Sequence, residues 1–524
     1  MRSNVLRVYK SVHTWAGIVS ALLLFIAFYA GALTMFGASL DAWVAPGAAR
    51  LPAIPIERAG RLIELARAAY PEAQAQFALD LPDPAHARFT WYTHDGCHWA
   101  AWLDARDTLH AAPSRCAGSP EFINLLHMTG GIPGGYVLGS TVMGLVSLLY
   151  GLALVSGLIV LLPTLVKDLF ALRFGANLKR LWLDIHNMLG VMSLPFHLVI
   201  ALTVVGFGLG EGIYALQDRT VYRGELDSIR QAGNAYYGPA PLHPQAAPLL
   251  APAGLLGTLE TRAPGFVPSS MGYRNAGGTA TSGATVYVEG SDPRYLAGRG
   301  VVLLDPVDGR LLNTAFLPGA GNRWTSLANA FEALHFGSYA GIAGRWSYFL
   351  LGMAGAGLFY TGNLLWIESR RKKQRREGET IAQRRACRIL AQLTVGVSLG
   401  CVTGISMLLV LDKLYAPHAT PSNIWTSDTY YGVFAACVAW AFARRPARAA
   451  SELCLLAAAA TAALPALSLC SAVTGLGTID AGDLSARAVD AVALIMAALL
   501  AWAARRVMRR ARTGAADSVW SLEN

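Results

Sequence analysis

The sequence has few charged residues for its length. Only 15% of its 524 residues are Asp, Glu, Lys or Arg, whereas 54% are hydrophobic. This balance lies outside the range of ordinary soluble domains and indicates a chain that folds largely in lipid. The formal net charge of +10 is compatible with nucleic-acid binding, but the basic residues lie beside long apolar runs. The charge therefore indicates membrane topology, and we expect no nucleic-acid partner.

Two cofactor motifs are absent. There is no Cys-x-x-Cys-His segment and no Gly-x-Gly-x-x-Gly after an expected strand, which excludes covalently attached haem and gives no sign of a nicotinamide or flavin domain. Of the seven cysteines, five lie in or beside C-terminal apolar runs and are expected to be small core residues. Cys97 and Cys116 lie in an extramembrane segment, where either a disulfide or two free thiols fits.

Long apolar runs dominate the rest of the sequence. The hydrocarbon core of a bilayer is about 30 Å thick, so a spanning helix needs about 20 apolar residues. Eight runs are candidates, of which the sixth is short: 15–36, 137–163, 187–209, 342–366, 389–411, 429–443, 452–473 and 487–504. The first run has no small-residue cleavage site near its end, so we expect it to remain as an anchor.

The basic residues fall in five segments: Arg2–Lys10, Lys167–Arg180, Arg370–Arg388, Arg444–Arg448 and Arg505–Arg512. All five lie on one side if both termini are cytoplasmic and eight helices alternate in direction, as the positive-inside rule requires. Two large segments, 37–136 and 210–341, then lie on the opposite side, and each is long enough for a small domain.

Each large segment has the pattern of a small α+β unit. In the first, the sequence predicts a helix and two strands: Arg61–Tyr70, Phe89–Tyr92 and His98–Leu103. In the second, it predicts three strands: Ala284–Glu289, Gly300–Leu304 and Arg310–Phe316. Asp305–Gly309 is typical of a hairpin turn, and the Gly and Pro content of 230–280 predicts long loops.

The chain also contains an internal repeat. Residues 1–163 and 179–366 share one plan: basic start, helix, extramembrane domain, returning helix and basic end. His13-Thr14-Trp15-Ala16-Gly17 corresponds to His186-Asn187-Met188-Leu189-Gly190, and Leu126-His127 corresponds to Leu334-His335. Both halves run in the same direction, which predicts a pseudo-two-fold axis along the membrane normal.

This symmetry places four of the 11 histidines in two pairs. His13 and His186 should meet at one end of the bundle, and His127 and His335 at the other. Two opposed imidazoles are the axial ligands of a low-spin haem, so we expect two haem b groups, with these residues as iron ligands. His197 lies on the third helix, where its repeat partner is Leu24, and it is an alternative ligand for the outer haem. Arg345 is a candidate to bind a haem propionate.

Competing interpretations remain open. A histidine at a membrane interface is also a common anchor or helix cap. Zinc would need three or four clustered ligands, which pairs at opposite faces do not supply. His94 and His98 could bind a metal only if they shared a helix, and the surrounding residues favour strand or turn. Helices five to eight contain no histidine and are expected to provide packing or an oligomer surface.

The segments HTWAG, LLHMTGG, HNMLG and LHFGSYAGIAGR together resemble the PepSY-associated transmembrane proteins, which include bacterial inner-membrane ferric-siderophore reductases and iron-uptake factors. The resemblance covers about residues 1–370. It implies a four-helix, two-haem protein with His13, His127, His186 and His335 as ligands, and it leaves His197 unplaced. It also implies reduction of periplasmic ferric siderophore, with release of Fe(II). The four extra C-terminal helices depart from the family pattern.

The expected fold is a mainly α membrane protein with about eight transmembrane helices, the first four forming a duplicated haem-binding bundle, and two small α+β periplasmic PepSY-like domains. The expected divisions are 1–36 (first transmembrane helix), 37–136 (first periplasmic domain), 137–209 (second and third helices), 210–341 (second periplasmic domain), 342–366 (fourth helix), 367–388 (basic cytoplasmic linker), 389–512 (fifth to eighth helices) and 513–524 (cytoplasmic tail).

The expected function is a ferric-siderophore reductase of the bacterial inner membrane, with both termini cytoplasmic. Its partners would be a ferric siderophore, membrane lipid and an electron donor, either a cytoplasmic reductase or a quinol. Two alternatives are a non-redox PepSY sensor or protease regulator and a transporter of iron or its chelate. A regulator would tolerate loss of His13 or His186, and a transporter would act without an electron donor.

Overall fold

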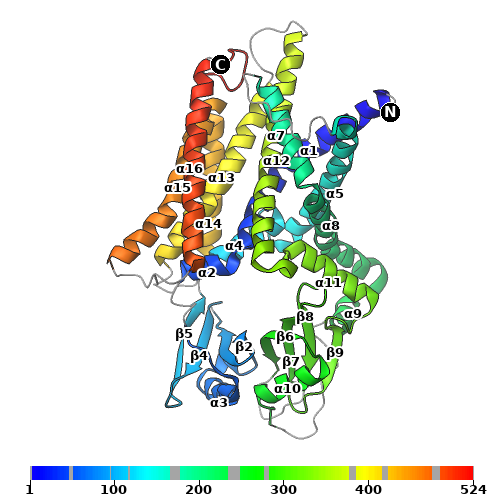
Figure 1. Ribbon diagram of the computed structural model, residues 1–524, viewed down its shortest axis with the longest axis vertical. Helices are drawn as coiled ribbons and strands as arrows, with labels where there is room; N and C mark the ends of the chain where they lie inside the picture. Colours follow the sequence, from blue (N-terminus) through cyan, green and yellow to red (C-terminus); the bar gives the residue numbers. More distant parts are fainter. Residues whose placement is uncertain are drawn as a thin grey trace.

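The structure is a computed structural model that describes residues 3–45, 51–94, 96–115, 118–165, 177–233, 236, 248–275, 283–376, 385–415, 423–474 and 484–522. Long helices stand side by side, and all the strands lie beyond one end of them (Figure 1). Both termini are at the opposite end of the helices, away from the strands (Figure 1).

Seven helices in the described ranges are long and apolar enough to span a membrane. They are α1 (Ser3–Thr34), α5 (Tyr136–Leu161), α8 (Leu194–Gln217), α12 (Gly341–Arg376), α13 (Arg385–Tyr415), α15 (Pro446–Thr474) and α16 (Leu484–Thr513). The prediction of a mainly helical, multi-pass membrane protein is confirmed. The short sixth run forms α14 (Asn423–Ala443), which packs against α13 and α15 but is not among these seven.

The third apolar run is not one helix, as the sequence suggested. It divides at Ser193 into α7 (Leu178–Met192) and α8, which begins at Leu194. Pro195 has no backbone N–H to continue the ladder of the preceding turn, and the Ser193 hydroxyl donates to the Leu189 carbonyl. The two helices formed by this run have different neighbours: α7 packs on α12, and α8 packs on α5.

The expected linker 367–388 is also largely helical. Helix α12 continues to Arg376 and α13 begins at Arg385, so only the residues between them lie outside the described part of the chain. Arg371 on this extension pairs with Glu368 and with Asp517 of the C-terminal segment, each at 2.9 Å. The extension of α12 thus holds the end of the chain against the helices.

The first two hairpins form a four-helix bundle with two-fold character. Helix α1 packs against α5 and α12, and the helix formed by α7 and α8 packs against the same two helices, α7 on α12 and α8 on α5. Helices α5 and α8 come into backbone contact at Gly144 and Gly208, where an added Cβ on either residue would lie 2.7–2.8 Å from the other helix's backbone. Small residues at such a crossing allow close packing in the absence of a hydrophobic driving force.

The extramembrane part consists of two similar units. The first contains β1 (Ile54–Pro55), α3 (Ala59–Ala69), β2 (Gln76–Asp83), β3 (His86–Tyr92), β4 (His98–Leu103) and β5 (Leu109–Arg115). The second contains α10 (Pro252–Arg262), β6 (Val267–Arg274), β7 (Thr285–Ser291), β8 (Gly300–Leu304) and β9 (Leu311–Phe316), and is preceded by α9 (Leu226–Gly233). Each is a helix followed by a four-stranded meander, so the predicted duplication extends to these units.

The two units share one sheet, which the sequence analysis did not predict. The strand order is β5-β4-β3-β2-β6-β7-β8-β9, and the first meander strands of the two units, β2 and β6, pair in antiparallel register. Leu79 faces Met271 in this register, and both side chains are fully buried in a core that includes residues of both units. The divisions 37–136 and 210–341 therefore meet in a single folded body.

All five predicted strands are present, but several neighbouring elements were missed. The predicted helix 61–70 and the predicted strands correspond to α3, β3, β4, β7, β8 and β9, whereas β1, β2, β5, β6 and α10 were not predicted. The segment expected to hold long loops, 230–280, contains α10 and β6. Two helices at the edges of the first extramembrane segment, α2 (Gly37–Val44) and α4 (Ser119–Thr129), pack on membrane helices instead of the sheet.

The shared sheet can be tested by crosslinking. Asp80 and Ser270 are direct partners across β2 and β6, and such partners have Cα atoms about 4.5–5.5 Å apart, within disulfide range. We expect Asp80→Cys/Ser270→Cys to form a disulfide under mild oxidation, detected as a crosslinked peptide by mass spectrometry. Asp80→Cys/Met271→Cys is the control, because Met271 follows Ser270 in the regular part of the β2–β6 pairing and its side chain points to the opposite face, into the core. Equal crosslinking of the two pairs would contradict the register.

Candidate cofactor-binding site

One histidine pair lies toward the end of the bundle that is opposite the sheet, and we call it the inner pair. It consists of His13 on α1 and His186 on α7. Their ring centroids are 6.1 Å apart and their planes make an angle of 67°. His13 Nδ1 donates to the Ala153 carbonyl oxygen on α5 at 2.8 Å, and His186 Nδ1 donates to the Leu358 carbonyl oxygen on α12 at 3.2 Å. A carbonyl oxygen only accepts, so each Nδ1 carries the proton and each Nε2 has a free lone pair.

The outer pair consists of His127 on α4 and His335 on α11 (Arg323–Phe336). Their ring centroids are 6.0 Å apart, with an interplanar angle of 33°. His127 Nδ1 donates to the Ala27 carbonyl oxygen on α1 at 2.8 Å. Thr203 Oγ1 on α8 donates its own hydrogen to the Val199 carbonyl oxygen, so it accepts from His335 Nδ1, also at 2.8 Å. Both Nε2 atoms again have a free lone pair.

The helices that carry the outer pair end in the same way. Gly130 follows α4 at φ 61°, ψ 22°, and Gly337 follows α11 at φ 62°, ψ 23°. This left-handed conformation is accessible to glycine at little cost and terminates a helix cleanly. Each glycine ends its helix within three residues of the histidine, and the chain then continues to the next membrane helix.

Burial keeps the outer imidazoles neutral. Helices α4 and α11 lie outside the seven candidate spans. Burial lowers the pKa of His127, and burial together with the neighbouring His127 lowers the pKa of His335 to about 3. Both rings are therefore uncharged at neutral pH, which is the protonation state that binds a metal.

Glycines leave space for three of the four rings. A Cβ added at Gly157 would lie 2.8 Å from the His13 ring, and one added at Gly31 would lie 2.5 Å from His127 Nδ1. At Gly362 the corresponding distance to His186 is 3.3 Å. Gly157 is four residues after Ala153 and Gly362 is four after Leu358, so each repeat supplies an acceptor carbonyl and a cavity for its ring at the same spacing.

His197 lies at the centre of the bundle, apart from both pairs. Its side chain is fully buried among Phe28, Phe196 and Phe359, with ring centroids 5.5–6.4 Å away. His197 Nδ1 shares a 2.5 Å hydrogen bond with the Tyr150 hydroxyl, and His197 Nε2 has no partner among the described residues. His127 and His335 face each other, so the outer pair is complete without His197. The alternative that His197 replaces one of them stays a prediction.

The two repeats differ around His197. Tyr150 lies three residues before Ala153 on α5, and the equivalent position on α12, three residues before Leu358, is Gly355. A Cβ added at Gly355 would lie 3.0 Å from the His197 ring. One repeat thus supplies a hydrogen-bond partner for His197 and the other supplies the space for it. The two repeats therefore differ at the centre of the bundle, where only one imidazole, that of His197, is present.

The other candidates stay outside this arrangement. Arg345, near the start of α12, is exposed and forms no ion pair with the described residues, so its role with a propionate stays a prediction. His98 begins β4 and hydrogen-bonds Ser114, while His94 is 92% exposed beside Glu72. Cys97 is disulfide-bonded, and Cys116 lies outside the described residues. Within the described residues, no three or more His, Cys, Asp or Glu side chains lie together in a group that could hold a metal ion.

Both pairs have the separation that a shared metal requires. Metal–imidazole bonds are about 2.0–2.1 Å long, so two imidazoles on opposite sides of one metal have ring centres about 6 Å apart. The observed separations are 6.1 and 6.0 Å. Each ring is oriented through Nδ1, as metal-binding histidines usually are. Each pair would therefore suit a metal group that is held by two imidazole nitrogens, as a bis-histidine haem is.

Comparison with known proteins places the chain in a family. Residues 10–369 match the family model described as the PepSY-associated TM region. The chain belongs to this family. The match contains both histidine pairs and stops within α12, before α13–α16. Over 319 residues, which are 56% of this chain and 75% of the other, the chain is 26% identical to the uncharacterized protein PA4219 of Pseudomonas aeruginosa.

Sequence reasoning found the histidines but missed the groups that orient them. Three of the acceptors are backbone carbonyl oxygens, which leave no trace in residue identity. Tyr150 and Thr203 were overlooked because each lies in an apolar run with no motif around it. The glycines opposite the rings were a usable signal, since Gly157 and Gly362 occupy equivalent places in the two repeats.

The bond between Tyr150 and His197 can be tested by removing the hydroxyl. Tyr150→Phe leaves His197 with no partner on either ring nitrogen, and an unsatisfied buried polar group costs about 1–3 kcal/mol. We expect a lower thermal unfolding midpoint in detergent. Tyr360→Phe is the control, because Tyr360 lies in the same bundle and makes no hydrogen bond to any of the described residues. Equal midpoints for the two variants would contradict the assigned bond.

Proposed function

We propose that the protein carries electrons across the bacterial inner membrane on two haem b groups and reduces a ferric siderophore on the side of the sheet. The observation that carries the proposal is the pair of opposed imidazoles at each end of one four-helix bundle. His13 and His186 would hold the inner haem, and His127 and His335 the outer haem. Haem supplies reversible one-electron chemistry, and two nitrogen ligands suit electron transfer because no position is left for substrate.

The positions of the pairs suit transfer through the membrane. Ala27, whose carbonyl oxygen orients His127, is 14 residues after His13 on α1, which is about 20 Å along a helix. The two sites are thus separated by most of the hydrocarbon core, about 30 Å thick. Phe28, Tyr150 and Phe359 pack between the two levels, with ring centroids 5.0–5.8 Å apart. This packing excludes water and keeps the bundle rigid between the sites.

The basic residues at the helix ends indicate how the protein is oriented in the membrane, and therefore which pair would pass electrons to the acceptor. The basic end of α12 and the basic C-terminal end of α16 lie opposite the sheet (Figure 1). By the positive-inside rule that end is cytoplasmic and the sheet is periplasmic. The outer pair, on α4 and α11, would then be the site that passes electrons to a ferric chelate. Fe(II) is held far more weakly than Fe(III) by hard oxygen ligands, so each transferred electron favours release of the metal.

The histidine assignment is tested by haem content. Purified protein should show a Soret band and carry two haems per chain. We expect His186→Ala to leave one haem, His335→Ala to leave one haem, and the double variant to leave none, as measured by absorption spectra and haem extraction. His86→Ala is the control, because His86 is an exposed sheet residue that bonds only Asp83. Wild-type protein without haem after expression with ample haem precursor would refute the proposal.

The acceptor is tested with reduced protein. Haem-loaded protein is reduced with dithionite, desalted without oxygen and mixed with a ferric hydroxamate chelate. We expect both haems to reoxidise and two Fe(II) ions per chain to appear in a ferrous-specific chelator, because each haem gives one electron. His335→Ala should reoxidise at least tenfold more slowly, since it lacks the outer haem. Haems that stay reduced in the wild-type protein would favour a sensor or a transporter.

A further inference from the structure

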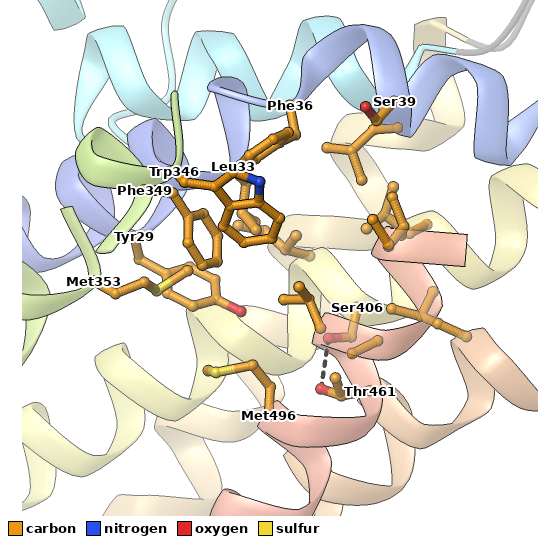
Figure 2. A pocket seen from close by; sticks show the side chains of 18 residues that line it. Tyr29, Leu33, Phe36, Ser39, Trp346, Phe349, Met353, Ser406, Thr461 and Met496 are labelled. Atoms are coloured by element: carbon orange, nitrogen blue, oxygen red, sulfur yellow. Dashed lines mark hydrogen bonds between the residues drawn. The ribbon is translucent and has the colours of Figure 1, made fainter. Parts of the chain in front are cut away.

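A cavity lies between the histidine bundle and the C-terminal helices. Its walls come from α1, α2 and α12 on one side and α13, α15 and α16 on the other (Figure 2). The volume of the cavity is about 80 Å³. Like other small-molecule sites, it has apolar walls and a few convergent polar groups. Helices α13, α15 and α16 lie beyond the family match, so this cavity exists only because of the C-terminal extension.

The lining of the cavity suits a flat ring with polar oxygens. Tyr29, Trp346 and Phe349 form an aromatic wall (Figure 2), with the Trp346 and Phe349 ring centroids 5.7 Å apart. Ser406 on α13 and Thr461 on α15 are both buried, and their hydroxyls hydrogen-bond each other at 3.0 Å at one place in the cavity lining (Figure 2). Both hydroxyls can bond a ring oxygen, because each is a donor and an acceptor.

The cavity shares its wall with the histidine bundle. Tyr29 is two residues after Ala27, the acceptor for His127, and directly follows Phe28, whose ring centroid is 5.5 Å from that of His197. Met353, another lining residue, is two residues before Gly355, which faces His197. Residues two apart lie on opposite faces of a helix, so α1 and α12 separate the cavity from the imidazoles by about one helix diameter, about 10 Å.

A carboxylate lies beside the cavity at its sheet-side end. Asp490 on α16 adjoins the lining residue Val489, and it accepts from Trp43 Nε1 at 2.8 Å and from Ser468 Oγ at 2.9 Å. Lys413 donates to Ser468 at 3.1 Å. This polar group is placed where α2 closes the bundle, so a proton released in the cavity has an acceptor on the way to the sheet side.

We propose that this cavity binds a membrane quinol, the electron donor of the proposed function on which this inference rests. The ring would pack on Trp346 and Phe349 with one oxygen at Ser406 and Thr461. The quinol loses two O–H hydrogens as two protons and two electrons and becomes a quinone. The two electrons would go one each to haems held by the two histidine pairs, and Asp490 would pass the two protons to water on the sheet side. A lipid-soluble donor agrees with the exposed apolar face of α16, where Leu494 and Ile495 are uncovered.

The test uses full-length, haem-loaded protein in its oxidised form. A short-chain quinol, decylubiquinol or menadiol, is added without oxygen and haem reduction is followed by absorbance. Ser406→Ala/Thr461→Val removes both hydroxyls, and Ala493→Phe fills the cavity. We expect at least a tenfold lower rate for the first variant and no reduction for the second, with unchanged haem content and unchanged reduction by dithionite. Thr403→Val is the control, because its hydroxyl bonds the Leu399 carbonyl oxygen away from the cavity.

A second measurement separates this inference from the haem assignment. An azido-quinone is photocrosslinked to the protein, and labelled peptides are identified by mass spectrometry whether or not haem is bound. Labels at Trp346 or Met353 that disappear in Ala493→Phe support the site. Wild-type rates of quinol oxidation in both cavity variants, or labels confined to other regions, would overturn the inference. Protein without haem that still carries these labels would refute the proposed function alone.

Discussion

The arrangement of the bundle depends on the hydrogen bonds that Nδ1 of each paired histidine makes to a neighbouring helix. A buried imidazole without a partner is costly, so each ring ties its own helix to the one that holds its acceptor. His13 and His186 connect α1 to α5 and α7 to α12 in this way. The same bonds turn the Nε2 atoms inward. The packing of the helices and the orientation of the imidazoles are therefore consequences of one constraint, and a change in either disturbs the other.

Duplication explains why the two ends of the molecule share one symmetry. In each repeat a membrane helix leads into a helix and a four-stranded meander, and then into a short helix that carries an outer histidine. Antiparallel pairing of β2 with β6 joins the two extramembrane units in one sheet. Helix α11 contacts β9, whereas α4 packs on membrane helices, so of the two outer histidines only His335 lies on a helix that contacts the sheet directly.

The departures from symmetry lie where function would need them. His197, Tyr150 and Gly355 break the repeat at the centre of the bundle. A single imidazole, whose Nε2 has no partner in the part of the chain that the structure describes, is surrounded there by aromatic rings. Helices α13–α16 break it at the side, where they turn one face of α1 and α12 into the wall of a cavity. A symmetric bundle would offer identical surfaces on both sides, whereas this chain has one side closed by its own C-terminal helices.

The sequence by itself determined the membrane class, the duplication and the pairing of His13 with His186 and of His127 with His335, because apolar length and repeated motifs are local properties of the chain. Only the tertiary structure decided what surrounds them. The break at Ser193, the β2–β6 pairing and the bond from Tyr150 to His197 depend on which segments lie side by side. Every residue has the same backbone carbonyl group, so the sequence does not show which carbonyl oxygens accept from the imidazoles. Those residues can be identified only from the packed helices.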